Sequence, residues 1–200
     1  MTFTTRLKEE ITKNDIDKIE SLVELSAFIT YAGQIKKNKI TLVMENASVA
    51  RRIYKDIKSN FGVNVKITVR NQKRFRVKQI YILEINEKID NILETLNIIK
   101  DGKRTLPSDF FLETQEEKIA YIKGAFLACG SVNDPSTGEY HLEYTSPQKN
   151  NGQFISKILS ASSLEYLSSF TEPLILYQLP HFSNLESLLV SSSPFTNIFA

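Results

Sequence analysis

Two clusters of basic side chains carry the clearest chemistry in this 200-residue sequence. Lysine and arginine bind phosphate oxygens, and clusters of them on exposed turns are typical of surfaces that meet nucleic acid. Each cluster surrounds a turn between two expected strands. The first contains Lys36, Lys37 and Lys39, and the second contains Arg70, Lys73, Arg74, Arg76 and Lys78. We interpret both turns as candidate phosphate contacts, and the alternative is that hairpin tips are charged only for solubility.

Side chains for catalysis or metal binding are scarce. The sequence contains two histidines, His141 and His181, and the single cysteine Cys129, with no pair of cysteines at metal-binding spacing. Cys129 falls on the apolar face of an expected helix, where a free thiol usually behaves as a small hydrophobic side chain. No glycine-rich loop of the kind that holds nucleotide phosphates is present. We therefore predict no catalytic residue, no metal and no cofactor.

The charge is divided unevenly along the chain. All 25 lysines and arginines lie at or before Lys157, and three of the 23 acidic side chains follow it, so residues 1–157 carry a net charge of +5. This modest surplus suits a surface near nucleic acid. The single cysteine, the charged beginning and the absence of about 20 consecutive apolar residues predict a cytoplasmic protein with no membrane segment.

Hydrophobic periodicity predicts the elements that position these residues. Helical spacing is expected over 3–13, 16–32, 46–61 and 87–97, and alternating patterns indicate strands over 34–37, 40–44, 63–70 and 75–85. The helix over 46–61 should turn its basic residues, Arg51, Arg52, Lys55 and Lys58, to solvent. The order is helix, two strands, helix, two strands, helix. We expect a first half over 1–98, a linker over 99–113 and the start of a second half over 114–159.

A helix motif occurs twice, as LSAFITYAG at 25–33 and IKGAFLACG at 122–130, with an offset of 97 residues. Glycine inside a helix costs about 1 kcal/mol relative to alanine, so Gly124 needs a compensating reason, and a close helix contact is the usual one. Gly33 and Gly130 fall where a helix would end in a left-handed residue. The alternative is that these are two ordinary core helices. The positions expected to pack the helix pair are Ala27, Gly33, Gly124, Ala128 and Gly130.

The repeated helices, each leading into strands, resemble the LAGLIDADG homing-endonuclease fold. Within that fold, the chain resembles the amino-terminal domain of the bacterial WhiA regulators. The segments that carry this resemblance are MTFTTRLKEEI at the start, MENASVARRIYKDIKSNFG at 44–62 and YIKGAFLACGSVNDPSTGEYHLEY at 121–144. The resemblance implies an α/β (α+β) fold with a pseudo-twofold repeat, in which one face of each sheet packs on the helices and the other faces DNA.

The same resemblance bears on catalysis. LAGLIDADG nucleases hold divalent metals with an acidic residue at the foot of each motif helix, just before the final glycine, and hard cations need such oxygen ligands. Those positions are Ala32 and Cys129 here, and neither side chain can ligate magnesium. We therefore expect a catalytically inactive domain. An active metal-dependent endonuclease is the less favoured alternative.

The resemblance also implies a function in transcription regulation, sporulation and cell division, with DNA as the partner and a location at the nucleoid. Members of this family carry a carboxy-terminal helix-turn-helix domain, and this chain ends before one could fit, so we expect weak, salt-dependent DNA binding. A protein-interaction module that contacts the transcription machinery remains an alternative.

The segment over 160–200 differs in composition from the rest. It contains ten serines and no lysine or arginine, and Pro173, Pro180 and Pro194 are expected to interrupt regular strands. We predict an atypical tail, as a reading-frame shift would produce, that leaves the second half incomplete or aberrant. A divergent native tail is the alternative.

Overall fold

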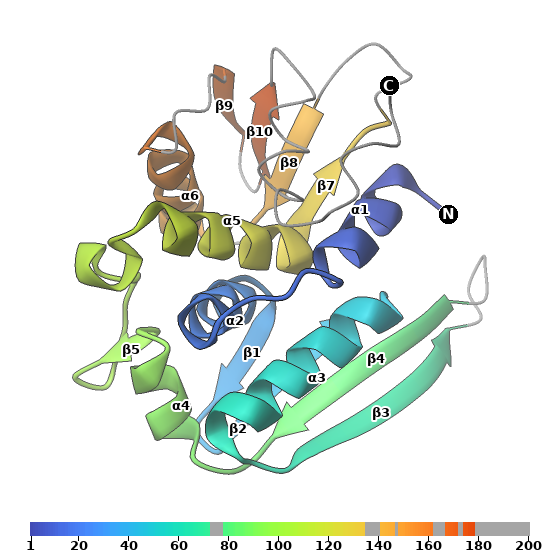
Figure 1. Ribbon diagram of the computed structural model, residues 1–200, viewed down its shortest axis with the longest axis vertical. Helices are drawn as coiled ribbons and strands as arrows, with labels where there is room; N and C mark the ends of the chain where they lie inside the picture. The colour runs from blue at the N-terminus through green and yellow to red at the C-terminus, as the bar shows by residue number, and fades with distance from the viewer. Residues whose placement is uncertain (73–77, 135–140, 147, 162–166, 172–173, 179–200) are drawn as a thin grey trace.

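A pair of helices lies at the centre of the protein, with a four-stranded sheet on each side (Figure 1). The computed structural model describes residues 1–72, 78–134, 141–146, 148–161, 167–171 and 174–178. Both sheets are antiparallel, and their strands follow the same spatial order, β1-β2-β4-β3 and β7-β8-β10-β9. This shared order is the pseudo-twofold repeat that the duplicated helix motif predicted.

The first half follows the expected order of elements. Its members are α1 (Phe3–Ile11), α2 (Lys18–Ala32), β1 (Gly33–Lys36), β2 (Lys39–Met44), α3 (Ala47–Phe61), β3 (Val65–Gln72), β4 (Lys78–Ile85) and α4 (Ile89–Thr95). Alternation in β2 and β4 sends Ile40, Leu42, Leu83 and Ile85 into the core, where each is fully buried. The opposite face of this sheet is turned away from the helices.

The second half begins after a short connection. That connection holds β5 (Ile99–Lys100), β6 (Lys103–Arg104) and the 3-10 helix η1 (Asp109–Leu112). The elements that follow are α5 (Gln115–Cys129), β7 (Gly130–Val132), β8 (His141–Thr145), α6 (Lys149–Ala161), β9 (Leu167–Thr171) and β10 (Leu174–Gln178). From its proline and glycine, the sequence also predicts a turn at Asp134-Pro135 and Gly138, and Pro135 and Gly138 lie outside the described residues.

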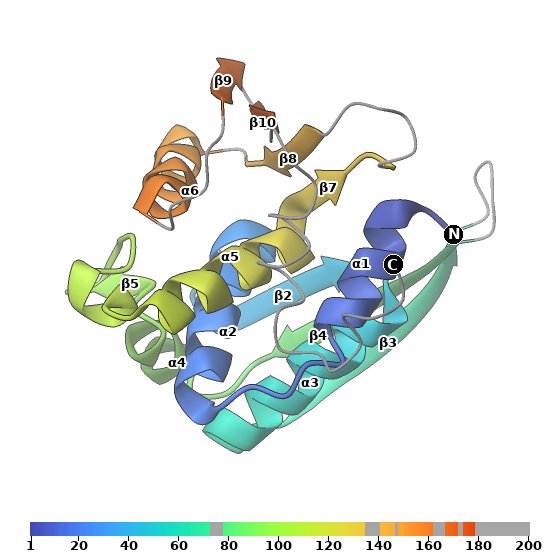
Figure 2. The ribbon, with the colours of Figure 1, turned by 45° about the horizontal axis from the view of Figure 1, so that its top comes forward.

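The central helices α2 and α5 begin with the same local signal and lie side by side (Figure 2). In α2 the Asp17 side chain accepts a hydrogen bond from the Glu20 backbone nitrogen at 2.8 Å, and the Glu20 carboxylate accepts one from the Asp17 nitrogen at 3.0 Å. Thr114 and Glu117 form the same reciprocal pair at the start of α5. This capping satisfies backbone donors that no helix turn can reach, and it explains why α2 starts at Lys18 rather than at residue 16.

The expectation of left-handed glycines at the helix ends is wrong. Gly33 and Gly130 both have extended backbones, with φ of −79° and −77°. They are needed for space: a Cβ atom on Gly33 would lie 2.3 Å from the Ile29 carbonyl oxygen, and one on Gly130 would lie 2.3 Å from a ring carbon of Phe126. Each glycine therefore allows a strand to leave its helix abruptly, against the last helical turn.

Helices α2 and α5 approach each other closely at Gly124. A Cβ atom there would lie 2.2 Å from the carbonyl oxygen of Glu24 and 2.9 Å from the Cβ of Ala27. These distances are below any normal contact, so only glycine lets the two backbones approach this closely. Ala128, one turn further along α5, is only half-buried. The helix motif thus places a close backbone approach at Gly124, beside Glu24 and Ala27.

The predicted tail contains two strands, contrary to the expectation that prolines would interrupt them. β9 pairs with β10, and β10 pairs with β8, so these strands complete the second sheet. Pro173 falls in the short interval between β9 and β10 rather than inside either strand. The origin of the tail by a frame shift stays a prediction, and residues 179–200 lie outside the described part of the chain.

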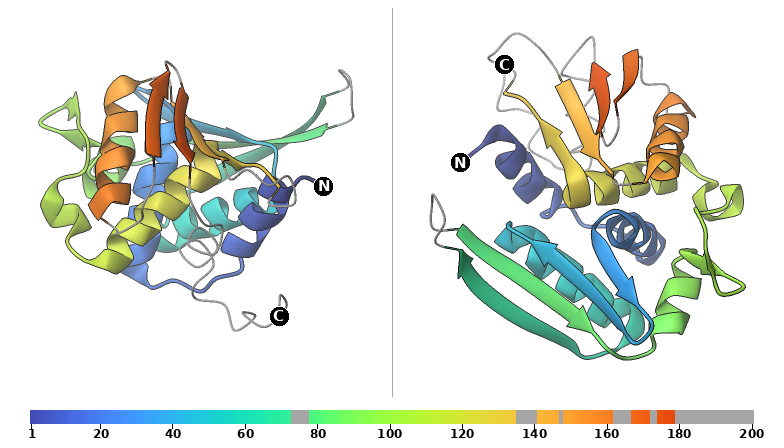
Figure 3. Two further views of the ribbon diagram at one scale, coloured as in Figure 1. Left: turned by 90° about the horizontal axis from the view of Figure 1, so that it is seen from above. Right: turned by 180° about the vertical axis from the view of Figure 1, so that it is seen from behind.

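Helix α1 joins the two halves along one side of the helix pair (Figure 3). The hydroxyl of Thr4 donates to the carbonyl oxygen of Val132 at 2.7 Å and accepts from the Val132 nitrogen at 3.0 Å. Leu7 and Ile11 are buried in the core, and α1 also packs on α3. α1 therefore ties the edge of the second sheet to the helix of the first half.

Candidate nucleic-acid interface

The last residue of each central helix has no side-chain oxygen that could bind a metal ion. Ala32 ends α2 and Cys129 ends α5, and the Cys129 thiol donates to the carbonyl oxygen of Ala125 at 3.4 Å. Burial raises the pKa of Cys129 to about 12, so the thiol stays protonated. In the part of the chain that the structure describes, no group of three or more His, Cys, Asp and Glu residues is arranged to hold a metal ion.

The side chain of Lys8 lies close to the carboxyl end of α5. The Lys8 ammonium donates to the carbonyl oxygen of Leu127 at 3.2 Å and lies 5.5 Å from the centre of the Phe126 ring. Burial lowers the pKa of Lys8 to about 8. A cation beside the carboxyl end of a helix is favoured by the helix dipole. A positive side chain thus lies at this helix end, where the resemblance to nucleases would place a carboxylate.

The outer face of the first sheet, defined as the face turned away from the helices, carries most of the described basic candidates. Alternation and strand pairing place on it Gln34, Lys36, Lys39, Thr41, Val43, Lys66, Thr68, Arg70, Ile80, Ile82 and Glu84. Lys36 and Arg70 are exposed there, and Lys37 is exposed in the adjacent turn. Lys73, Arg74 and Arg76 lie outside the described residues, as does the side chain of Lys78.

The strand ends next to the two basic segments lie at opposite ends of this sheet. Strand pairing sets Ile40, just after the first turn, beside Ile85, and it sets Ile85 beside Val65 at the start of β3. The connection between β3 and β4 follows Gln72, at the far end of β3. Strands rise about 3.3 Å per residue, so the two ends are separated by about 23 Å. A duplex touching both ends must therefore run along the strands, over about seven phosphates of one DNA strand.

An acidic side chain lies between the basic ones. The carboxylate of Glu84 pairs with the ammonium of Lys39 and lies 3.7 Å from that of Lys66. These partners lower the pKa of Glu84, with Lys39 the largest contributor. The sequence prediction missed both Lys66 and Glu84, although alternation along β3 and β4 would have placed them on one face. Glu84 partly neutralises the outer face and occupies donors that would otherwise be free for phosphate.

The outer face of the second sheet carries an acidic side chain, Glu143, bonded to two hydroxyl groups. The hydroxyls of Ser131 and Thr145 each lie 3.4 Å from the Glu143 carboxylate, to which they donate. Strand pairing places Glu143 at the position that Thr41 holds in the first sheet. Among the described residues, the candidate phosphate contacts therefore gather on the first sheet.

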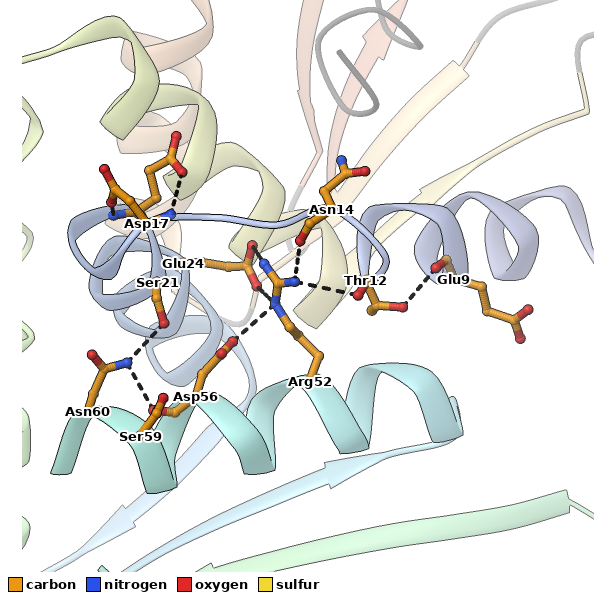
Figure 4. Close-up of polar contacts among 11 residues, drawn as sticks. Glu9, Thr12, Asn14, Asp17, Ser21, Glu24, Arg52, Asp56, Ser59 and Asn60 are labelled. Carbon is orange, nitrogen blue, oxygen red and sulfur yellow. Dashed lines mark hydrogen bonds and ion pairs between the residues drawn. The ribbon is translucent and has the colours of Figure 1, made fainter. Parts of the chain in front are cut away.

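Arg52 on α3 is not turned to solvent, contrary to the sequence prediction. Its side chain is only 10% exposed and forms ion pairs with Glu24 at 3.0 Å and Asp56 at 3.1 Å (Figure 4). Its guanidinium also donates to the carbonyl oxygens of Thr12 and Asn14, at 3.4 and 2.6 Å. Arg52 therefore holds the connection between α1 and α2 against α3, which is a structural role.

Burial raises the pKa values of the two acidic groups in this cluster. It raises the pKa of Glu24 to about 7, because desolvation outweighs the attraction of Arg52, and it also raises the pKa of Asp56. Lys123, on α5, contributes a further nearby positive charge and is itself buried. The cluster thus links α2 to α3, and the buried Lys123 of α5 lies near it.

Comparison with known proteins places this architecture. A family model described as the WhiA N-terminal LAGLIDADG-like domain matches residues 18–99, and one described as the WhiA LAGLIDADG-like domain matches residues 118–172. A relative from Staphylococcus aureus (strain NCTC 8325 / PS 47), named probable cell division protein WhiA, is 37% identical over 169 residues, which cover 82% of this chain and 54% of the relative. The chain belongs to the WhiA family. It spans about half the length of the curated relatives it matches.

Solved structures agree with this fold. Full-length DUF199/WhiA from Thermatoga maritima superposes with a TM-score of 0.72 at 18% identity, covering 97% of this chain and 63% of that one. The homing endonuclease I-DmoI, in complex with DNA and Mn, superposes with a TM-score of 0.54 at 14% identity, covering 88% of this chain and 99% of that one. The WhiA match over residues 118–172 extends into the predicted atypical tail. No helix in the described ranges is long and apolar enough to cross a lipid bilayer.

Proposed function

We propose that this WhiA-family domain is a non-catalytic DNA-binding part of a regulator of cell division and sporulation. The outer face of the first sheet contacts the phosphate backbone, without reading sequence on its own. The observation that carries this proposal is the series of exposed basic side chains, Lys36, Lys66 and Arg70, that runs along one sheet face from end to end. The LAGLIDADG neighbour I-DmoI was solved in complex with DNA, which supports the choice of ligand.

Absence of catalysis is part of the same proposal, and it rests on residue types. A metal-dependent nuclease needs oxygen ligands at its helix feet, and Ala32 and Cys129 supply none. The relatives are named probable cell division proteins, which fits a regulatory rather than a degradative role. In such a regulator, this domain would add affinity for DNA.

We expect the logarithm of the DNA affinity to fall linearly with the logarithm of the salt concentration, by about 0.9 for each phosphate contacted. Replacing Lys36 and Arg70 with alanine should make the slope shallower by about 2, because each side chain gives up one phosphate contact. Fluorescence anisotropy with a short labelled duplex, repeated over a range of salt, measures this slope.

The matched control replaces Lys100 and Lys103 with alanine, which removes the same charge from the exposed β5–β6 hairpin. Equal changes in slope for both double variants would reject the proposed interface.

Incubation of the same preparations with supercoiled plasmid and magnesium or manganese should give no nicking. Metal-dependent nicking that persists through purification would instead support the endonuclease alternative.

Glu84→Gln should strengthen DNA binding by about three- to tenfold, because it removes a negative charge from the outer face and releases Lys39 and Lys66. The salt slope should become steeper at the same time. Glu94→Gln on α4 is the matched control, since it makes the same change of charge at an exposed position away from the sheet. An unchanged affinity for the Glu84 variant would show that DNA does not approach this face.

A further inference from the structure

The strand β3 ends the first sheet. The order β1-β2-β4-β3 leaves one side of β3 paired with β4 over all eight of its residues, and the other side lies at the edge of the sheet. An edge strand presents backbone N–H and C=O groups that can pair with another extended chain. Figure 1 shows β3 and β4 projecting past α3 toward the right of the view.

The two faces of β3 differ sharply in chemistry. Ile67 and Val69 are paired with Leu83 and Tyr81, so they lie on the helix side of the sheet, yet they are 49% and 51% exposed. The core that covers Leu83 does not extend over these two side chains. Lys66 and Arg70 alternate with them on the outer face and are exposed. The strand thus offers an apolar pair on one face and a basic pair on the other.

A second copy of the chain is a poor occupant of this edge. The antiparallel register that sets Ile67 opposite Val69 of the copy also sets Lys66 opposite Arg70 of the copy. Like charges directly opposite each other in a sheet are destabilising. The same two basic side chains would favour a strand that carries acidic residues at those positions.

We propose that the edge of β3 binds an extended acidic segment of a partner protein, which adds as a further strand to the first sheet. Alternate residues of the segment are apolar and pack on Ile67 and Val69, and the residues between them are Asp or Glu and face Lys66 and Arg70. Backbone hydrogen bonds supply affinity in this mode, and the alternating side chains supply specificity. This site shares Lys66 and Arg70 with the proposed DNA contact, and it differs from that contact in also using the strand edge and the two apolar side chains.

The test uses the full chain and a fluorescein-labelled peptide that alternates Glu and Val. We expect saturable binding in anisotropy, with amide chemical-shift changes centred on residues 65–70. A peptide of the same composition, with its Glu and Val residues in separate blocks, should bind about tenfold more weakly, because it cannot present one type of side chain to each face. Equal binding of the two peptides, or no binding at about 1 mM, would overturn the proposal.

Variants separate this site from the DNA interface. Val69→Lys and Ile67→Thr lie on the helix side and should each weaken peptide binding several-fold while leaving DNA affinity within about twofold. Ile67→Thr keeps a β-branched residue in the strand, so it serves as the safer variant for folding. A parent chain that binds the Glu–Val peptide but does not bind DNA would count against the proposed function alone.

Charge reversal gives the sharpest result. The double variant Lys66→Glu with Arg70→Glu should bind the Glu–Val peptide about tenfold more weakly than the parent chain does. It should also bind a Lys–Val peptide, which the parent chain does not. Sedimentation equilibrium of the parent chain tests the competing occupant. If the parent chain forms a dimer and Val69→Lys abolishes it, a second copy occupies the edge of β3 and the proposal is overturned. A parent chain that stays monomeric at every concentration would support the proposal.

Discussion

Gly124→Ala is expected to destabilise the protein by about 3 kcal/mol, at the upper end of the usual cost of overpacking. The added Cβ would meet the Glu24 backbone carbonyl oxygen at 2.2 Å, and a backbone atom in the middle of α2 cannot turn aside as the end of a side chain can. Alanine would otherwise favour the helix by about 1 kcal/mol, so the expected loss of stability is net of that gain. Urea unfolding of the two proteins measures the difference in the free energy of unfolding.

Gly62→Ala is the matched control for this substitution. Nothing lies within 4 Å of a Cβ at Gly62, but its φ of +61° is unfavourable for alanine, so we expect a loss of about 1 kcal/mol from backbone strain alone. A Gly124 variant no less stable than the Gly62 variant would show that α2 and α5 do not touch there. Because the two sheets lie on either side of this helix pair, the Gly124 variant should also lose DNA binding at temperatures where it begins to unfold.

Arg52→Met is expected to cost about 3–5 kcal/mol, because it leaves the carboxylates of Glu24 and Asp56 buried without their main partner. Methionine retains most of the length of the side chain, so the loss reports on charge and hydrogen bonding more than on packing. Its neighbour Arg51 is exposed and bonds only to Ser48 among the described contacts. Arg51→Met should therefore change the free energy of unfolding by less than about 0.5 kcal/mol.

The pH dependence of this loss identifies its cause. The folded pKa of Glu24 is raised from its ordinary value of 4.5 to about 7, so the stability linked to this group is greatest below pH 4.5 and is lost as the pH rises through 7. Removing Arg52 raises that pKa further. The Arg52 variant should therefore lose more stability at pH 8 than at pH 5, and a loss independent of pH would point to packing instead of buried charge.

The sequence predicted the order of elements well because that order depends on local pattern. Helical and alternating spacing, together with the repeated motif at 25–33 and 122–130, located both helices of the central pair and most strands of the first half. The strands in the tail were missed, because prolines were taken to interrupt strands and Pro173 falls between β9 and β10 instead. Strand pairing with β8 decides those strands, and a local pattern contains no information about that partner.

The candidate site shows the same division. The sequence by itself determined that the helix feet carry Ala32 and Cys129, whose side chains cannot ligate magnesium, and that basic residues cluster near two expected turns. Only the tertiary structure decided that the strand ends beside these basic residues lie at opposite ends of one sheet, that Glu84 lies among the lysines, and that Arg52 is buried. The physical reason is that side-chain chemistry is a property of each residue, whereas burial and charge pairing depend on residues brought together from distant parts of the chain.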